Sequence, residues 1–315
     1  MTTRTTSRLK ASIMVLLGAA SYGILSTFVK LAYQAGFKPS EVTGSQVLMG
    51  CAALWLFSLP LWGRIREISA RDRWKLMGGG TFTGLTGVFY YYSLTALDAS
   101  FAVLLLFQFT WMGLLLDWIL HGKTPGKFQI VAVGIILGGT LLASGMTTGH
   151  FQHVSIYGIG LGLLSVACYT LFIYFSGRVA VQVPALLRST WMITGAAVAV
   201  SLIYPPQFLW NGTLGQGLWI WGALLGFFGM VIPSYLYAKG APHIETGLSS
   251  ILGAVESPVV VLCSGLLLQE KTGWLQWLGI AFILAGMAVS EFKPGSGRTK
   301  RPGINKRHSI LVHHA

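Results

Sequence analysis

Ten apolar stretches of roughly 20 residues each follow one another between Ser12 and Glu291, and short polar segments separate them. A helix needs about 20 apolar residues to cross a hydrocarbon layer of ~30 Å, where the backbone must satisfy its own hydrogen bonds. The sequence therefore predicts an all-α integral membrane protein with ten transmembrane helices. The expected spans are 11–33, 41–62, 74–96, 98–120, 127–146, 155–177, 184–204, 217–238, 244–268 and 273–291.

Basic residues are distributed unevenly across these spans. If ten helices are drawn, 19 of the 22 Lys and Arg residues fall on one side of the membrane. Lys38 and Lys271 fall on the other side, and Lys30 lies inside the first span, where we expect its side chain to reach outward. The positive-inside rule then places both termini in the cytoplasm of a cell whose plasma or inner membrane the chain crosses repeatedly.

The net charge of +13 has a local origin, because the basic residues adjoin membrane spans and interleave with no aromatic nucleic-acid-binding motif. Anionic lipid headgroups at the cytoplasmic face are the expected partners, and no nucleic acid is expected. Residues 1–10 are expected to form a cytoplasmic N-terminus, and 292–315 a basic, disordered cytoplasmic tail. The histidines of that tail have no second ligand cluster nearby, so no metal site or other cofactor is expected.

The chain also repeats itself. A shift of 147 residues aligns Gln129 with Gln276 and Gly139 with Gly286, and a shift of 145 aligns Tyr90 with Tyr235 further upstream. Two five-helix repeats result, at 11–146 and 155–291. An odd number of crossings per repeat forces the second to enter the membrane from the opposite side. Inverted repeats are typical of secondary transporters, which bind their substrates near the bilayer midplane between the repeats.

The stretch from Ala241 to Ser290 resembles the second half of an EamA-type transporter of the drug/metabolite transporter superfamily. The elements that carry the resemblance are the small residues Ser249, Ser250 and Gly253, the mid-span Pro258 after an acidic residue, the segment Gln269-Glu270-Lys271 and a glycine-bearing last helix. The segment from Leu94 to Ser144 resembles the first half more loosely. The resemblance implies ten helices, cytoplasmic termini, and export of small metabolites, amino acids or toxic compounds.

Three positions depart from the pattern of that family. Ser257 separates Glu256 from Pro258, where the acidic residue usually precedes the proline directly. The first half has Phe109-Thr110-Trp111 in place of the proline, and Lys123 where a glutamate often stands.

Glu256 is the acidic residue nearest the middle of any span, and ionised side chains at that depth usually face a cavity. It is a candidate for binding a proton or the amine of a substrate. The alternative is a structural role, in which a protonated Glu256 bonds to a hydroxyl or a carbonyl. Pro258 can kink the helix beside it, because proline frees a backbone carbonyl one turn back.

Polar and aromatic residues at similar depth complete the candidate cavity. Gln108 and Trp111 would suit a ligand with apolar and hydrogen-bonding parts, although interhelical hydrogen bonding explains them equally well. Tyr22, Tyr91 and Tyr169 are further cavity candidates. Other tyrosines fit the aromatic belt at the membrane interface better: Tyr90, Tyr92, Tyr235 and Tyr237. Asp117 is expected at the cytoplasmic interface or beside Lys123.

Other classes of protein fit less well. An intramembrane protease needs a histidine or a second acid near its nucleophile at depth, whereas His121, His150, His153 and His243 lie at loops or span ends, so no enzyme is expected. The sequence predicts a secondary transporter that carries a small amphipathic metabolite, amino acid or drug outward by alternating access, with protons as possible coupling ions. A lipid or glycolipid flippase and a passive channel are the alternatives.

Overall fold

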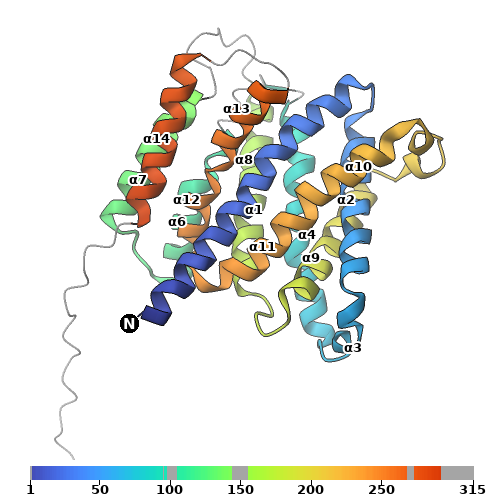
Figure 1. The fold of residues 1–315 in the computed structure, drawn as a ribbon, viewed down its shortest axis with the longest axis horizontal. Coiled ribbons are helices and arrows are strands. Elements are labelled where there is room, and N and C mark those ends of the chain that lie inside the picture. Colours follow the sequence, from blue (N-terminus) through green and yellow to red (C-terminus); the bar gives the residue numbers. More distant parts are fainter. Residues whose placement is uncertain (1, 95, 98–104, 144–154, 268–272, 292–315) are drawn as a thin grey trace, which may run out of the picture.

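The computed structural model describes residues 2–94, 96–97, 105–143, 155–267 and 273–291, which form a bundle of helices (Figure 1). The α-helices are α1 (Thr2–Gln34), α2 (Pro39–Phe57), α3 (Trp62–Ile65), α4 (Ala70–Leu94), α6 (Phe109–His121), α7 (Lys127–Ala143), α8 (Ile156–Arg178), α9 (Ala185–Ile203), α10 (Trp219–Gly226), α11 (Ile232–Gly240), α12 (Thr246–Gly253), α13 (Glu256–Leu267) and α14 (Trp274–Glu291). The π-helical turns η4 (Leu214–Leu218) and η5 (Phe227–Val231) flank α10, and the 3-10 turns are η1 (Leu59–Leu61), η3 (Gln207–Leu209) and η6 (Ala241–His243). The described residues contain no β-strand, which confirms the all-α prediction. The segment Gln269-Glu270-Lys271 and the tail 292–315 lie outside the described residues.

Five of the described helical segments are long and apolar enough to cross a membrane. They are Arg8–Gln34, Ile156–Arg178, Ala185–Ile203, Leu214–His243 and Thr246–Leu267. A sixth is added if α2 and the segment Leu59–Ile65, which meet at 52°, form one bent span. The helices α7 and α14 are apolar but shorter, and α4 contains many Gly, Thr and Tyr residues, which lower its hydropathy. The ten spans that the sequence predicts therefore exceed what length and composition establish for the described helices.

Helices of the two halves begin at equivalent positions. α7 and α14 start 147 residues apart, and α2 and α9 start 146 residues apart. Before α7, Gly126 N donates to Gln129 Oε1 at 2.9 Å, and before α14, Gly273 N donates to Gln276 Oε1 at the same distance. Each glutamine thus satisfies a backbone donor at the start of its helix. The alignment of Gln129 with Gln276 in the sequence reappears as a repeated hydrogen bond.

The two halves interlock. In the first half, α4 packs against α8 and α9 of the second half, α1 packs against α11 and α13, and α2 packs against α10. Figure 1 shows the blue α1 running beside the orange helices of the second half, with α7 and α14 together at one side. The largest buried apolar cluster draws residues from both halves, including Val15, Leu76, Phe109, Phe172 and Leu252. One core therefore serves both repeats.

Equivalent helices run in opposite directions where they touch. The contact between α7 and α14 brings Gly279 to Gly139, and Gly286 to Ala132. Positions in α14 therefore advance while those in α7 recede, and α6 and α12 contact each other in the same antiparallel manner. Antiparallel packing of equivalent helices is what a twofold axis in the membrane plane produces.

A buried arginine fixes one end of the bundle. Arg188, in the first turn of α9, is 2% exposed and donates to the carbonyl oxygens of Val179 at 3.1 Å, Ala238 at 2.7 Å, and Ser176. These carbonyls lie at the ends of α8 and α11, where helices leave acceptors unpaired and where positive charge is favourable. We call this the basic end of the bundle, because Arg178, Arg188 and Lys239 all lie here.

Glycines permit the closest helix crossings. A Cβ atom on Gly80 of α4 would lie 1.8 Å from the carbonyl oxygen of Met192 in α9, so these two backbones are in direct contact. Gly134 and Gly138 of α7 are four residues apart, as are Gly80 and Gly84 of α4. An added Cβ on Gly134 or Gly138, however, would have no atom within 4 Å. The GxxxG spacing of Gly134 and Gly138 therefore does not mark a close helix contact. Gly139 makes the close contact with α14 instead. It lies on a different face of α7 from Gly138, because each residue turns an α-helix by about 100°.

We predict that Gly80→Ala destabilises the protein by about 1–3 kcal/mol, because the new methyl group forces α4 and α9 apart. Gly134→Ala is the matched control and should leave stability unchanged or slightly raised, since alanine favours helix and has free space there. Thermal unfolding of both variants in detergent, followed by intrinsic fluorescence, measures the difference. Equal unfolding temperatures would contradict the backbone contact.

Candidate functional site

Glu256 begins α13 directly after a break in the helical backbone. α12 ends at Gly253. In the turn between the helices, backbone hydrogen bonds join residues three apart instead of four, as from Ser257 N to Ala254 O at 3.2 Å. Pro258 lies in the first turn of α13, where the missing N–H of a proline has no intrahelical acceptor to lose. The interruption thus lies before Pro258, and Glu256 is the first residue of the helix that follows the break.

Three tyrosines lie within electrostatic range of Glu256. They are Tyr22 on α1, Tyr169 on α8 and Tyr237 on α11. The Tyr22 hydroxyl also interacts with the side chain of Thr83 on α4. The first half therefore contributes α1 and α4 to this site, and the second half contributes α8, α11 and α13. The structure brings together Glu256, Tyr22 and Tyr169, which the sequence proposed separately.

The tyrosine rings belong to a continuous aromatic cluster. Tyr169 meets Tyr22 edge-on at 5.9 Å between ring centroids and meets Phe109 edge-on at 4.9 Å. Phe172 lies between Tyr169 and Tyr237, at 6.3 Å and 5.9 Å. Such arrangements favour a rigid wall, because ring edges and faces attract one another. Glu256 and Tyr22 keep partial exposure in front of this wall, while Tyr169 and Tyr237 are buried.

Two buried hydroxyls of this site lack a well-formed hydrogen bond. Tyr169 and Tyr237 interact with each other, but neither hydroxyl completes such a bond in the described structure. Buried polar groups are normally paired with protein or water. Glu256, in turn, forms no ion pair with any Lys, Arg or His among the described residues. The site therefore offers a carboxylate, hydroxyls and ring faces to a ligand that supplies donors or positive charge.

Gln108 and Trp111 bond to each other. The indole Nε1 of Trp111 donates to Gln108 Oε1 at 2.8 Å. Trp111 packs against an apolar cluster of α6, α7, α12 and α14, which includes Leu114, Ile136 and Ile251 and contains none of the site tyrosines. The structure thus does not bring Trp111 to the tyrosines, and a binding role for this pair stays a prediction. Tyr91 lies on α4, but its side chain is outside the described residues.

Tyr237 belongs to the site, although its sequence position suggested the aromatic belt. It is fully buried, whereas Tyr235 is partly exposed, with its ring 5.6 Å from Lys239 Nζ. The helical period carries the signal that was missed. Tyr235 and Lys239, four residues apart, share the outer face of α11, so Tyr237 must point to the opposite face.

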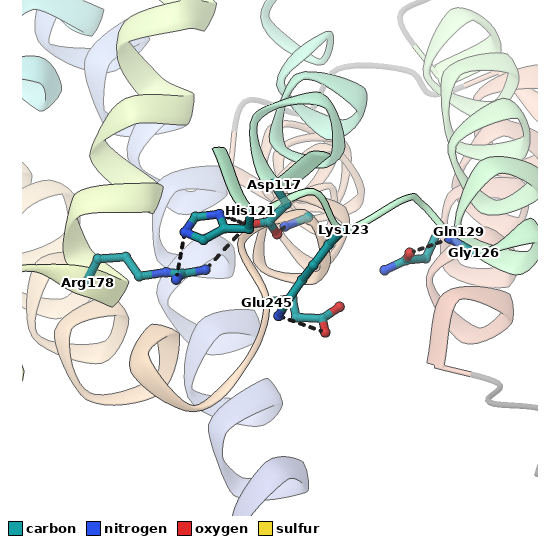
Figure 2. Close-up of polar contacts among 8 residues, drawn as sticks. Asp117, His121, Lys123, Gly126, Gln129, Arg178 and Glu245 are labelled. Atoms are coloured by element: carbon teal, nitrogen blue, oxygen red, sulfur yellow. Dashed lines mark hydrogen bonds and ion pairs between the residues drawn. The ribbon is translucent and has the colours of Figure 1, made fainter. Parts of the chain in front are cut away.

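A second polar cluster joins the halves at the basic end (Figure 2). Asp117, near the end of α6, is 5% exposed and accepts a hydrogen bond from Gly247 N, at the start of α12, at 2.8 Å. Arg178 Nη2, at the end of α8, lies 3.4 Å from the same carboxylate. His121 lies between them, with Nδ1 3.6 Å from Asp117 Oδ1 and Nε2 3.0 Å from Arg178 Nη1. Asp117 thus ties α6 of the first half to α8 and α12 of the second.

Lys123 forms a separate ion pair beside this cluster. Its Nζ lies 3.5 Å from Glu245 Oε1, and both side chains are about half exposed (Figure 2). The expectation that Asp117 would pair with Lys123 is therefore wrong. Asp117 points inward to the buried start of α12, while Lys123 follows the turn at the end of α6 and reaches the surface acid.

Comparison with known proteins identifies the family. The EamA-like transporter family matches residues 9–145 and again residues 156–291. The chain belongs to the EamA-like transporter family. Its two matched segments correspond to the two sets of equivalent helices, and the chain is accordingly a membrane transporter.

Two bacterial relatives align with nearly the whole chain. It is 24% identical to the uncharacterized transporter sll1319 of Synechocystis sp., over 93% of this chain and 96% of that protein. It is 23% identical to the uncharacterized transporter YcbK of Bacillus subtilis, over 90% of this chain and 94% of that protein. A crystal structure with 18% sequence identity superimposes with a TM-score of 0.72, covering 89% of this chain and 96% of that one, which shows a shared fold.

We predict that Asp117→Ala destabilises this transporter by about 2–4 kcal/mol, because Gly247 N and Arg178 lose a partner that is largely buried. Glu245→Ala should change stability by less than about 1 kcal/mol, since its ion pair is solvated. Thermal unfolding in detergent compares the two variants. Equal losses of stability in the two variants would contradict the difference between the buried contacts of Asp117 and the solvated ion pair of Glu245.

Proposed function

We propose that the chain is a secondary transporter of ten transmembrane helices, arranged as two inverted five-helix repeats at 11–146 and 155–291. The proposed substrate is a small amphipathic metabolite, amino acid or drug, and the proposed direction is export. One observation carries the proposal: Glu256 lies at the junction of the halves, with tyrosines of both halves around it. Inverted-repeat transporters place their substrates at such a junction.

The antiparallel contacts between equivalent helices support alternating access. When two halves have nearly the same fold in opposite orientations, two arrangements of similar energy exist, each open to one side. In the described arrangement, Asp117 with Arg178 and Lys123 with Glu245 hold the halves together at the basic end. Opening that end requires these contacts to separate. We propose that they close one access path while substrate enters or leaves by the other.

Exchange of substrate for a proton follows from the chemistry of Glu256. An ionised carboxylate in an apolar bundle is unfavourable unless positive charge accompanies it. A proton or the amine of a substrate can supply that charge in turn, and competition between them at one carboxylate would couple their movements. The partial exposure of Glu256 and the lack of an ion pair with described basic residues support this role.

The orientation in the membrane rests on charge. Arg178, Arg188 and Lys239 share one end of the bundle, and cytoplasmic loops carry the excess of Lys and Arg in membrane proteins. We therefore propose that the basic end faces the cytoplasm of a cell membrane. Residues 1–10 and the tail 292–315 would lie on the same side.

The test is transport in proteoliposomes, with a panel of labelled amines, amino acids and aromatic metabolites and with imposed pH gradients. We expect wild-type protein to move at least one of these solutes and to respond to the gradient. Glu256→Gln should lower the gradient-driven rate by about tenfold or more, because the amide neither binds a proton nor carries charge.

Glu245→Gln is the matched control, since it removes a half-exposed acid at the basic end and leaves Glu256 intact. Unchanged rate and pH response in Glu256→Gln would contradict proton exchange while leaving transport in place. An ionic current with no movement of labelled solute would contradict the carrier itself.

A further inference from the structure

An apolar groove of about 750 Å³ opens on the outer surface of the bundle, away from Glu256. Its walls come from the end of α2, the start of α9, and the segment from η5 through α11. Phe57 of α2 and Phe227 of η5 both line it and are 47% and 43% exposed. Apart from Lys239 at one end, its lining is apolar or aromatic. The groove therefore has the volume and character of a ligand pocket.

The local backbone explains why the groove exists. The turn η5 is π-helical, and Pro233 follows it in the first turn of α11. A π-helical turn inserts an extra residue and displaces the next helix, and such turns are frequent at functional sites. On the opposite side, Pro184 precedes the first turn of α9. The displaced helix leaves space between α11 and its neighbours α2 and α9 that no side chain fills.

Positive charge stands at one end of the groove. Lys239 is exposed on α11, with its Nζ 5.6 Å from the centre of the Tyr235 ring, and both residues line the groove. This end adjoins the basic end of the bundle, because Ala238, next to Lys239, accepts a hydrogen bond from Arg188. Arg64 follows the groove residue Leu61 by three positions and is also exposed. An anionic group would therefore meet favourable charge here, and apolar chains would meet the walls.

We propose that this groove binds an anionic phospholipid of the leaflet at the basic end. The acyl chain would lie along Phe57, Leu186, Phe227 and Leu236, and Lys239 would contact the phosphate, with Tyr235 at the interface between the two parts. Tyrosine and lysine commonly occupy this level of a membrane. Because α2 belongs to the first half and α9 and α11 to the second, the lipid would contact both halves at once.

Lipid binding to the full-length protein in detergent tests the proposal without any transport assay, so its outcome is independent of the proposed function. Native mass spectrometry would follow titration with phosphatidylglycerol and with phosphatidylcholine of the same acyl chains. We expect wild-type protein to retain phosphatidylglycerol more tightly. Lys239→Gln should weaken phosphatidylglycerol binding about fivefold and phosphatidylcholine binding clearly less, because the choline cation already balances the phosphate charge of that lipid.

Lys75→Gln is the matched control, because Lys75 is an exposed lysine of α4 that does not line the groove. Ala185→Leu tests the acyl site separately, since added bulk on that wall should weaken both lipids. An unchanged phosphatidylglycerol preference in Lys239→Gln would overturn the proposal. Equally tight binding of glycerol phosphate, which has no acyl chains, would overturn it too. So would a dimer in which two copies of the Phe227→Cys variant cross-link at that residue and the groove binds no lipid.

Discussion

Hydrocarbon supplies no hydrogen-bond partners, and this constraint shapes each irregular part of the structure. Regular helices satisfy their own backbone groups, so breaks are tolerated only where other protein atoms cover them. The break before Glu256 uses short turns and lies between α1, α8 and α11. The carbonyls at the ends of α8 and α11 are bound by Arg188. The backbone N of Gly247, at the start of α12, is bound by Asp117. The places where the helical pattern fails are therefore the places where side chains with specific chemistry gather.

Interlocking of the halves gives these breaks their significance. Because α1 and α4 pack mainly on helices of the second half, Tyr22, whose hydroxyl interacts with Thr83, lies near a carboxylate that belongs to the other repeat. A site assembled in this way changes shape whenever the repeats shift relative to each other. The glycine contact between α4 and α9 keeps one such surface smooth, since no side chain separates Gly80 from Met192. The helix contacts that join the repeats thus also determine the surroundings of Glu256.

Much of this arrangement could be predicted from the sequence. Hydropathy and repeat spacing indicated an all-helical chain of two related halves, and the hydrogen bonds of Gln129 and Gln276 match that alignment. Membrane depth singled out Glu256, Tyr22 and Tyr169, because few polar groups occur in the middle of an apolar stretch.

Contacts between distant helices were not predictable in the same way. The pairings of Asp117 with Arg178 and of Lys123 with Glu245 depend on which parts of two helices meet, and one sequence fixes spacing along a helix but not its neighbour. Tyr237 was wrongly assigned to the aromatic belt at the membrane interface. It precedes Lys239 by two residues and therefore lies on the opposite face of α11, where it is buried. The GxxxG spacing of Gly134 and Gly138 likewise does not identify the buried face of α7, which carries Gly139.

Arg188 makes the two halves unequal. The repeat offset of α2 and α9 places Val42 at the corresponding position of the first half, where it is buried but brings no charge and no donors. At this position the second half joins three helices through one charged side chain, whereas the first half relies on apolar packing. The duplication is therefore approximate, and a property inferred for one repeat does not transfer to the other without a check of the residue at the equivalent position.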